Sequence, residues 1–406
     1  MKIQKTNQLN PMVIPLASSK SESNRVLIIN ALSANKSQLH NLSSARDTQV
    51  MKSLLTSDSN TYDVHDAGTV MRFLTAYLSI QQQESVIMGS PRMHQRPIGL
   101  LVEALRKLGA DIEYLQEAGF PPLKIRGFSN QLNNELSIPG NISSQYISAL
   151  LMIAPCISKG LKINLEGEIY SLPYIKMTLA LMRRFGIDYS FEGSTIHIKP
   201  QTYKASDYTI ESDWSGASYW FSMIALAENS EMQLRGLRQD SLQGDYAIVG
   251  IMAHLGVTTI FTEDGVHLRN TKADDTLSYD FRNCPDLAQT VIALAAAKRI
   301  RLQMSGLESL KIKETDRISA MATEVRKIGA ILDEPQTGVW TLEFDDEMEI
   351  PEEIVFDTYE DHRMAMALAP LCLKYNIQIN DPEVVKKSYP EFWDHLKLAG
   401  VSMISE

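Results

Sequence analysis

The stretch that decides the fold is "LVEALRKLGADIEY", residues 101–114, because its pattern returns along the chain. Each copy is an amphipathic helix, then a glycine, then a short strand-like run. The further copies are "MTLALMRRFGIDYS" (177–190), "IVGIMAHLGVTTIF" (248–261), "MATEVRKIGAILDE" (321–334) and "FWDHLKLAGVSMI" (392–404). By subtraction, the glycines of successive copies are 77, 70, 73 and 71 residues apart. We expect each glycine to cap its helix in the left-handed conformation.

A second set of helices alternates with the first, and its members are apolar on nearly every side. A helix of this kind lies buried inside a domain. Dividing 406 residues by the repeat interval gives nearly six units, each with two helices and several strands. The sequence therefore predicts an α/β protein whose buried helices are "SNRVLIINALS", "GTVMRFLTAYL", "SSQYISALLMIA", "SGASYWFSMIALA", "PDLAQTVIALAAA" and "DHRMAMALAPLCL".

Composition excludes several classes of function. The formal net charge of -10 argues against general nucleic-acid binding, although it leaves room for a local basic pocket. The start of the chain lacks the apolar core of a signal peptide, and no apolar run is long enough for a membrane helix. We expect a cytoplasmic protein whose three cysteines, Cys156, Cys284 and Cys372, are buried and reduced. The histidines and cysteines show no metal-binding spacing, so no metal is expected.

Cations gather at the expected helix starts, where a helix by itself favours acids. In "KIKETDR", residues 311–317, Lys313 and Arg317 stand at the beginning of a helix. Serine, threonine and aspartate in such first turns are ordinary N-caps in most single cases, but capping does not explain the cations. Because helix N-termini bind anions, the pattern predicts a pocket for a polyanionic ligand where these ends meet. The first turns concerned are 20–25, 69–72, 143–145 and 361–363.

Eight motifs, in order, resemble those of the 5-enolpyruvylshikimate-3-phosphate (EPSP) synthase family, and the resemblance covers about residues 15 to 398. The closing "VVKKSYPEFWDHL" (384–396) is similar to the C-terminal signature of that family. The eight are "SSKSESNRVLIINAL", "DAGTVMRFL", "RMHQRPIGLLVEALRKLGA", "GNISSQYISALLMIAP", "SLPYIKMTLALM", "SLQGDY", "IKETDRISAMATEVRKIGA" and "TYEDHRMAMAL".

The resemblance implies a two-domain, inside-out α/β barrel with six βαβαββ repeats, three in each domain. It places residues 15–212 in one domain and 1–14 plus 213–406 in the other, with crossovers near 12–17 and 210–214. It also implies a monomer that binds its substrates in an interdomain cleft and closes on them. The short segment 56–65 predicts that one repeat of the first domain has lost a hairpin.

The reaction implied by the resemblance transfers the enolpyruvyl group of phosphoenolpyruvate to the 5-hydroxyl of shikimate 3-phosphate and releases phosphate. It proceeds by addition and elimination, with no cofactor. Asp286 resembles the carboxylate that takes the proton of the 5-hydroxyl, and Glu314 resembles the group that exchanges a proton with the methylene carbon. Lys20 competes for part of the second role, and His362 would tune Glu314 or contact substrate.

The same resemblance implies two sets of binding residues. Hydroxyls at helix starts suit phosphate oxygens, and the planar fork of arginine grips carboxylate or phosphate through two bonds. Arg72 ranks behind these residues, as a supporting one. The set for shikimate 3-phosphate is Lys20, Ser21, Arg25, Ser143, Ser144, Gln145, Ser171, Tyr174, Asp286, Ser309 and Lys313. The set for phosphoenolpyruvate is Lys20, Gly68, Arg96, Gln145, Glu314, Arg317, Arg363 and Lys387.

Some positions depart from the family pattern. Ser18 stands where glycine is usual, and asparagine is usual at Asp66, Ser309 and Glu360. These departures put affinity in question more than the type of reaction. They also leave open a non-catalytic relative that only binds anions, although such a protein would need neither Asp286 nor Glu314.

Two other functions fit the sequence less well. The sister transferase that acts on UDP-N-acetylglucosamine carries a reactive cysteine, and the matching stretch "MGSPRMHQRPIG" has none. A nucleotide-binding interpretation of "SSKS" fails because the P-loop pattern is missing. Seen alone, Glu314 and Arg317 could be an ordinary surface pair worth about 0 to 1 kcal/mol.

Overall fold

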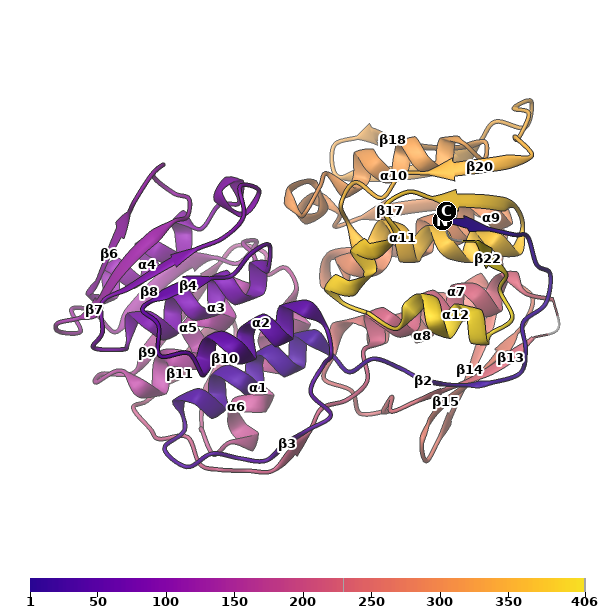
Figure 1. Cartoon of the computed structure of the whole chain (residues 1–406). Helices are drawn as coiled ribbons and strands as arrows, with labels where there is room; N and C mark the ends of the chain where they lie inside the picture. Colours follow the sequence, from indigo (N-terminus) through magenta and orange to yellow (C-terminus); the bar gives the residue numbers. More distant parts are fainter. Residues whose placement is uncertain (229, 405–406) are drawn as a thin grey trace. The chain divides into compact units, whose positions relative to one another are not determined.

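The computed structural model describes residues 1–228 and 230–404, and the chain divides into two compact units. Unit 1 comprises Met1–Ser18, Ser44–Arg46 and the chain from Glu211 onward. Unit 2 comprises Ser19–Ser43 and Asp47–Ile210. Figure 1 shows both units as helices combined with small sheets.

The two larger sheets of unit 2 follow one pairing plan. In each, a first strand pairs in parallel with a second, a third pairs antiparallel with the second, and a fourth pairs antiparallel with the third. In that order, one sheet consists of β4 (Thr61–Asp63), β5 (Ser85–Met88), β7 (Leu123–Phe128) and β6 (Ala110–Tyr114). The other consists of β8 (Glu135–Pro139), β9 (Leu161–Glu166), β11 (Thr195–Ile198) and β10 (Ser190–Glu192).

The sheets of unit 1 repeat this plan, and two of them use strands from the start of the chain. The first consists of β2 (Val13–Pro15), β13 (Glu231–Arg235), β15 (Gly265–Asn270) and β14 (Val257–Thr262). The second consists of β16 (Thr276–Asp280), β17 (Arg301–Ser305), β19 (Val339–Phe344) and β18 (Ala330–Gln336). The third consists of β20 (Glu353–Phe356), β21 (Asn376–Ile379), β1 (Lys2–Ile3) and β22 (Met403–Ile404).

One sheet of unit 2 is much smaller than the rest. It pairs β3 (Leu39–His40) in parallel with β12 (Tyr208–Thr209), and it has two strands among the described residues. After α2 (Arg46–Leu55) the chain runs through residues 56–60 without a strand and then enters β4. The segment after this helix is therefore too short for the hairpin that follows α4 (Gly99–Leu108).

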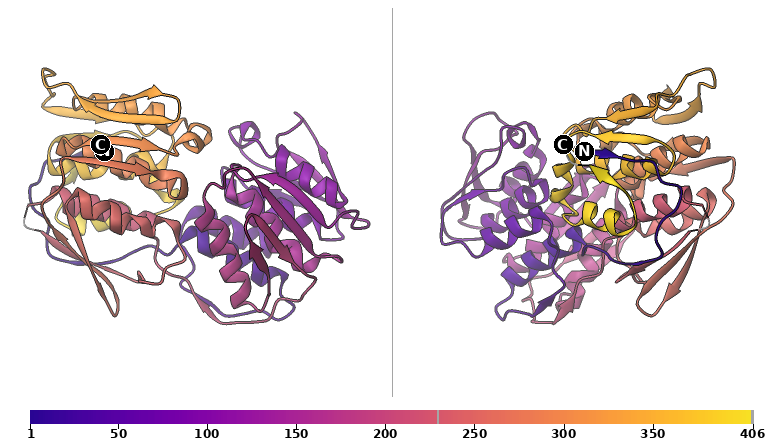
Figure 2. Two further views of the ribbon diagram at one scale, coloured as in Figure 1. Left: turned by 180° about the vertical axis from the view of Figure 1, so that it is seen from behind. Right: turned by 45° about the vertical axis from the view of Figure 1, so that its right-hand side comes forward.

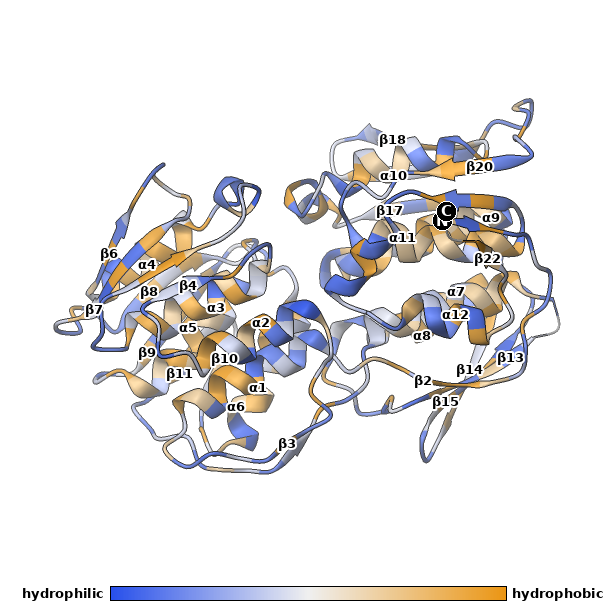
Figure 3. Cartoon of the chain, in the orientation of Figure 1, coloured by the Kyte–Doolittle hydropathy of each residue, from blue (hydrophilic) through white to orange (hydrophobic). Residues whose placement is uncertain are grey.

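The inner helices form the cores of the units, and hydrophobic residues predominate along them (Figure 3). In unit 2, α1 (Lys20–Leu32), α3 (Gly68–Ser79) and α5 (Ser144–Ile153) contact one another. In unit 1, α7 (Trp214–Leu226), α9 (Ala288–Lys298) and α11 (His362–Leu368) do the same, and Figure 2 shows two further views of them. These are the six segments predicted to be buried, and the burial of their side chains confirms that prediction.

The outer helices carry one apolar face, as the repeated pattern predicts. Besides α2 and α4, they are α6 (Leu172–Arg184), α8 (Ile248–Leu255), α10 (Arg317–Arg326) and α12 (Phe392–Leu398). No helix in the described part of the chain is both long and apolar enough to cross a membrane.

The three cysteines do not all lie in the core. Cys284 and Cys372 are buried, but the prediction of burial is wrong for Cys156. This residue ends the short 3-10 turn Ala154–Cys156 after α5, where the chain leaves the core and the side chain turns outward.

The glycines that end the repeated helices all have positive φ, which confirms their predicted role. The φ angles of Gly109, Gly186, Gly256, Gly329 and Gly400 are 115°, 84°, 97°, 74° and 92°. At Gly109 the space is also closed, because an added Cβ would lie 2.2 Å from the backbone oxygen of Asn130. A side chain there would strain the backbone and collide with it.

Replacing Gly109 by alanine is expected to lower the free energy of unfolding by about 3 kcal/mol or more, from left-handed strain plus the collision. Gly119→Ala is the matched control, since Gly119 has φ 92° and no atom within 4 Å of an added Cβ. It should cost only the strain, about 1 to 2 kcal/mol. Urea unfolding of both variants measures the difference, and equal losses would contradict the role given to the Asn130 contact.

Candidate active site

In unit 1, the guanidinium of a residue at the start of α10 lies among several carboxylates. Asp316 is the N-cap, and it accepts from the backbone N–H groups of Ile318 and Ser319 at 3.1 Å. The next residue, Arg317, is the first residue of the helix. Its side chain is 3% exposed, so each of its charge-assisted bonds lies in a partly desolvated environment.

Arg317 bonds three carboxylates at once. Its Nε is 2.7 Å from Asp361 Oδ2, its Nη1 is 3.0 Å from Asp286 Oδ1, and its Nη2 is 2.9 Å from Glu314 Oε2. Burial lowers the pKa of Arg317, but the three carboxylates outweigh that effect and raise the pKa above its usual value. The Glu314–Arg317 contact therefore belongs to a buried network and not to an exposed surface pair.

Asp286 lies at the centre of this cluster, just before α9. Its Oδ2 accepts from Arg363 Nη2 at 2.9 Å, and Lys313 Nζ lies 3.6 Å from its Oδ1. Burial alone would raise the pKa of Asp286. Arg363, Lys313 and Arg317 together overcome that penalty and hold its pKa well below the usual range. In this state the carboxylate is ionised and is a weak base.

Glu314 connects a further cation to the cluster. Its Oε1 is 3.2 Å from Nζ of Lys387, which is buried at the end of the 3-10 turn Pro382–Lys387. The structure thus brings together six residues that the sequence selected from motifs spread over about 100 positions. They are Asp286, Lys313, Glu314, Arg317, Arg363 and Lys387.

Two predicted residues of unit 1 lie apart from these bonds. His362 is buried at the start of α11, where its Nδ1 is 3.7 Å from Asp361 Oδ1. Ser309 is half-buried in the 3-10 turn Glu308–Ile312. Nearby, Glu360 has φ 56°, a region that asparagine tolerates better than glutamate, so this departure costs some conformational energy.

Sequence reasoning missed two members of the cluster, Asp245 and Ser215. The Oγ of Ser215 donates to Asp245 Oδ2 and lies 3.3 Å from Arg363 Nη2. Burial raises the pKa of Asp245 to about 6, although Arg363 opposes the shift. The motif "SLQGDY" was the available signal, because its aspartate had been given no role and a buried aspartate needs a partner. Nothing local to that motif identified Ser215 as the partner.

In unit 2, Arg25 of α1 is a buried cation whose hydrogen bonds all go to neutral groups. Its Nε donates to Thr178 Oγ1 at 2.8 Å, its Nη1 to the backbone oxygen of Ser21 at 2.8 Å, and its Nη2 to Ser148 Oγ at 3.2 Å. The guanidinium also faces the rings of Phe73 and Tyr174. Burial lowers the pKa of Arg25 to about 10.

Two further guanidinium groups enclose Gly68 at the start of α3. An added Cβ there would lie 2.5 Å from Arg72 Nη1 and 2.7 Å from Arg96 Nη1. Arg72 therefore stands as near to Gly68 as Arg96 does, a closeness that its lower sequence ranking did not anticipate. The next residue, Thr69, accepts a bond from Gln145 Nε2 at 3.0 Å, which links α3 to α5.

The other predicted residues of unit 2 stand at helix starts. Lys20 is the first residue of α1, and its Nζ lies 3.3 Å from Asp47 Oδ2. Ser21 follows it. Ser143 caps α5 by accepting from the N–H of Gln145, and Ser144 begins that helix. Ser171 precedes α6 with φ 54° and makes no side-chain cap. Its hydroxyl is therefore not explained by capping.

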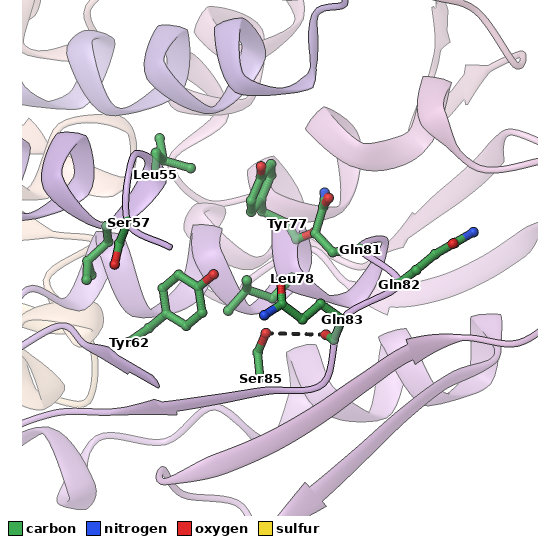
Figure 4. A pocket seen from close by; sticks show the side chains of 10 residues that line it. Leu55, Ser57, Tyr62, Tyr77, Leu78, Gln81, Gln82, Gln83 and Ser85 are labelled. Atoms are coloured by element: carbon green, nitrogen blue, oxygen red, sulfur yellow. Dashed lines mark hydrogen bonds between the residues drawn. The ribbon is translucent and has the colours of Figure 1, made fainter. Parts of the chain in front are cut away.

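A separate pocket of unit 2 holds none of the predicted site residues. It has a volume of about 400 Å³ and lies where α2 ends, near Tyr62 of β4 and Tyr77 of α3. Figure 4 shows these two rings with Gln81, Gln82 and Gln83 around it. No charged side chain lines it, so it lacks the chemistry of an anion site.

Comparisons with known proteins agree with the motifs. The model of the family "EPSP synthase (3-phosphoshikimate 1-carboxyvinyltransferase)" matches residues 52–396. A 3-phosphoshikimate 1-carboxyvinyltransferase from Bacteroides fragilis is 48% identical over 392 residues, which covers 95% of each chain. The enzyme of the same name from Vibrio campbellii is 34% identical, over 95% of this chain and 96% of its own.

Two solved structures share the fold. EPSP synthase from Acinetobacter baumannii matches with a TM-score of 0.80 at 20% identity and covers 99% of both chains. The enolpyruvyl transferase NikO from Streptomyces tendae matches with a TM-score of 0.75 at 12% identity, over 99% of this chain and 97% of its own.

The raised pKa of Asp245 predicts a stability change that depends on pH. Because its folded pKa of about 6 exceeds the ordinary value of 3.8, the unfolded state loses its proton first. The stability contributed by this carboxyl group is present below pH 3.8 and is lost as the pH rises through 6. Asp245→Asn should therefore raise the free energy of unfolding above pH 6, by up to about 3 kcal/mol. Denaturant unfolding of both proteins across pH 4 to 8 measures this, and an equal gain at every pH would contradict it.

Proposed function

Because the chain belongs to the EPSP synthase family, we propose that it transfers the enolpyruvyl group of phosphoenolpyruvate to the 5-hydroxyl of shikimate 3-phosphate. Phosphate is the second product, and the reaction belongs to the shikimate pathway of aromatic biosynthesis. The observation that carries the proposal within unit 1 is the cluster of Lys313, Arg317, Arg363 and Lys387 around Asp286 and Glu314. The resemblance also implies a cytoplasmic monomer.

The cluster supports a mechanism in which the cations exchange their carboxylate partners for the anionic groups of the substrates. Arg317, Arg363 and Lys387 would bind the phosphate and carboxylate of phosphoenolpyruvate, while Lys313 would contact the shikimate phosphate. A cation that turns to a substrate anion no longer holds Asp286 or Glu314 as firmly. Since these cations hold the pKa of Asp286 down, their departure raises its basicity. Substrate binding would thus convert a weak base into a competent one.

The proton transfers then follow from the two carboxylates. Asp286 accepts the proton of the 5-hydroxyl as that oxygen attacks C2 of phosphoenolpyruvate, while C3 gains a proton. In the elimination step C3 loses a proton and phosphate departs, which leaves the enol ether. Glu314 would exchange the C3 proton, with Lys20 competing for part of the role. His362, buried beside Asp361, would act by orienting the cluster.

In unit 2 the proposal assigns the shikimate phosphate to the helix starts around Arg25. A buried guanidinium with neutral partners keeps its full charge available for an anion. Ser21, Ser143, Ser144, Gln145, Ser171 and Tyr174 would supply the other contacts there. Gly68 lets the guanidinium of Arg96 lie close to the backbone, where Arg96 would bind phosphoenolpyruvate.

We also propose that the six sheets correspond to six βαβαββ repeats, one of them shortened. The common pairing plan of five sheets supports this, as does the order β4–α3–β5–α4–β6–β7 along the chain. The pair β3–β12 would be the shortened repeat, with domain boundaries and crossovers near the expected 12–17 and 210–214.

Phosphate release on mixing the protein with both substrates tests the function. We expect release with shikimate 3-phosphate and none with UDP-N-acetylglucosamine as acceptor. Glu314→Gln and Asp286→Asn should each lose about 100-fold or more of the rate, because general acid–base groups contribute about 10² to 10⁴. Binding of shikimate 3-phosphate without any release would indicate an anion-binding relative and would reject the transferase.

Replacing Arg25 tests the proposed site for the shikimate phosphate in unit 2. Arg25→Met keeps the length of the side chain and removes a buried charge, so it should leave the thermal midpoint near that of the wild type. The same variant should lose the rise in midpoint that shikimate 3-phosphate gives the wild type. Thermal unfolding with and without the ligand measures both. An unchanged rise would remove Arg25 from the proposed site. Arg184→Met, the same substitution at an exposed position of α6, is the control.

A further inference from the structure

A chain of hydrogen bonds runs from Asp286 through Arg363 and Ser215 to Asp245. Arg363 Nη2 is 2.9 Å from Asp286 Oδ2 and 3.3 Å from Ser215 Oγ, and Ser215 Oγ bonds Asp245 Oδ2. The same guanidinium therefore touches a proposed catalytic carboxylate and, through one hydroxyl, a second carboxylate. Neither Asp245 nor Ser215 belongs to the substrate-binding residues proposed above.

The geometry fixes which group donates and which accepts in each of these hydrogen bonds. A serine hydroxyl has one proton, and that of Ser215 goes to Asp245, so its lone pairs are left to accept from Arg363. The position of Ser215 is fixed because its backbone N–H donates to Asp213 Oδ1 at 2.8 Å. Asp245 is also fixed, because it is 2% exposed and lies in the 3-10 turn Gly244–Ala247.

We infer that Asp245 is a positioning residue, which, through Ser215, holds the guanidinium of Arg363 in place when that arginine leaves Asp286 for the phosphoenolpyruvate anion. The inference rests on the proposed function. Arg363 also donates through Nη1 to the backbone oxygen of Asp286 at 3.2 Å and to Tyr219 Oη at 3.5 Å, so Ser215 is the contact, or anchor, that orients Nη2. Without it, Nη2 would lose its fixed direction toward the bound anion, at a cost in affinity. The effect should appear in the affinity for phosphoenolpyruvate and not in that for shikimate 3-phosphate.

The contact from Asp245 through Ser215 to Arg363 should depend on whether the carboxyl group of Asp245 is ionised. Arg363 of α11 favours the ionised form, while Asp286, before α9, and Asp213, the cap of α7, oppose it. The buried thiol of Cys284 is another titratable neighbour, and burial raises its pKa to about 12, so it stays neutral. With a pKa of about 6, Asp245 is ionised at neutral pH and protonated in mild acid.

The experiment compares the KM for phosphoenolpyruvate of the wild type and of Asp245→Asn at about pH 8 and about pH 5. The titration of the substrate cancels in the ratio of the two proteins. We expect the KM of Asp245→Asn divided by that of the wild type to be about 10 at the higher pH, because one charge-assisted bond is lost. At the lower pH the same ratio should be near one. The KM for shikimate 3-phosphate should stay within about twofold, since that ligand does not depend on the anchor.

Controls separate positioning from a structural role. Ser215→Ala should reproduce the loss at pH 8, and the double variant should lose no more than either single one, because both act through one chain. Asp240→Asn removes an exposed charge from the preceding loop and should leave the ratio at one. A ratio that is the same at both pH values, or full additivity of the two substitutions, would overturn the inference.

A readout without turnover keeps this test distinct from that of the proposed function. Titration calorimetry with phosphoenolpyruvate alone, without shikimate 3-phosphate, leaves no acceptor for the transfer, so the ratio of the two dissociation constants reports binding only. If the wild type released no phosphate, the proposed function would fail while the binding ratio still judged the anchor. If the wild type were active and the ratio of the two proteins did not change with pH, only the positioning role of Asp245 would be rejected.

Discussion

The shared carboxylate of Asp286 is the interaction on which unit 1 depends. Arg317 and Arg363 are buried, Lys313 is half-buried, and all three lie close enough to repel one another. Asp286 contacts each of them, and with Glu314 and Asp361 it offsets that repulsion. Removing one partner from such a buried network leaves an uncompensated charge, which costs about 3 to 5 kcal/mol. The same contacts lower the pKa of Asp286, because the cations stabilise its ionised form.

The repeated fold explains how these charges meet. The inner helices α7, α9 and α11 pack side by side, and the residues at or just before their starts are Ser215, Asp286 and Arg363. The starts of these three helices meet, so side chains about 70 residues apart in sequence become neighbours. The positive ends of these helices add to the cations, which makes the carboxylates necessary in the absence of another anion.

The sequence predicted features that depend on local pattern, but few that depend on which distant side chains become partners. The five capping glycines and the buried helices follow from spacing and hydrophobicity, and both were correct. The cations at helix starts indicated an anion site because they conflict with the helix dipole. Three features were missed: the partnership of Asp245 with Ser215, the approach of Arg72 to Gly68, and the exposure of Cys156. Each depends on where a side chain points after distant segments have packed, which no local period encodes.

The two units solve the problem of a buried cation in opposite ways. Arg25 has hydroxyl, carbonyl and aromatic partners, and its lowered pKa records the cost of burying its charge, which nearby Glu22 offsets only in part. Arg317 and Arg363 have carboxylates, which remove that cost and also occupy the sites where an anion would bind. A ligand at Arg25 would meet a guanidinium whose hydrogen bonds go to neutral groups, whereas a ligand in unit 1 would compete with Asp286 and Glu314 for the cations. That competition is productive if the displaced carboxylates are the groups that move protons, because binding energy then raises their basicity at the moment it is needed.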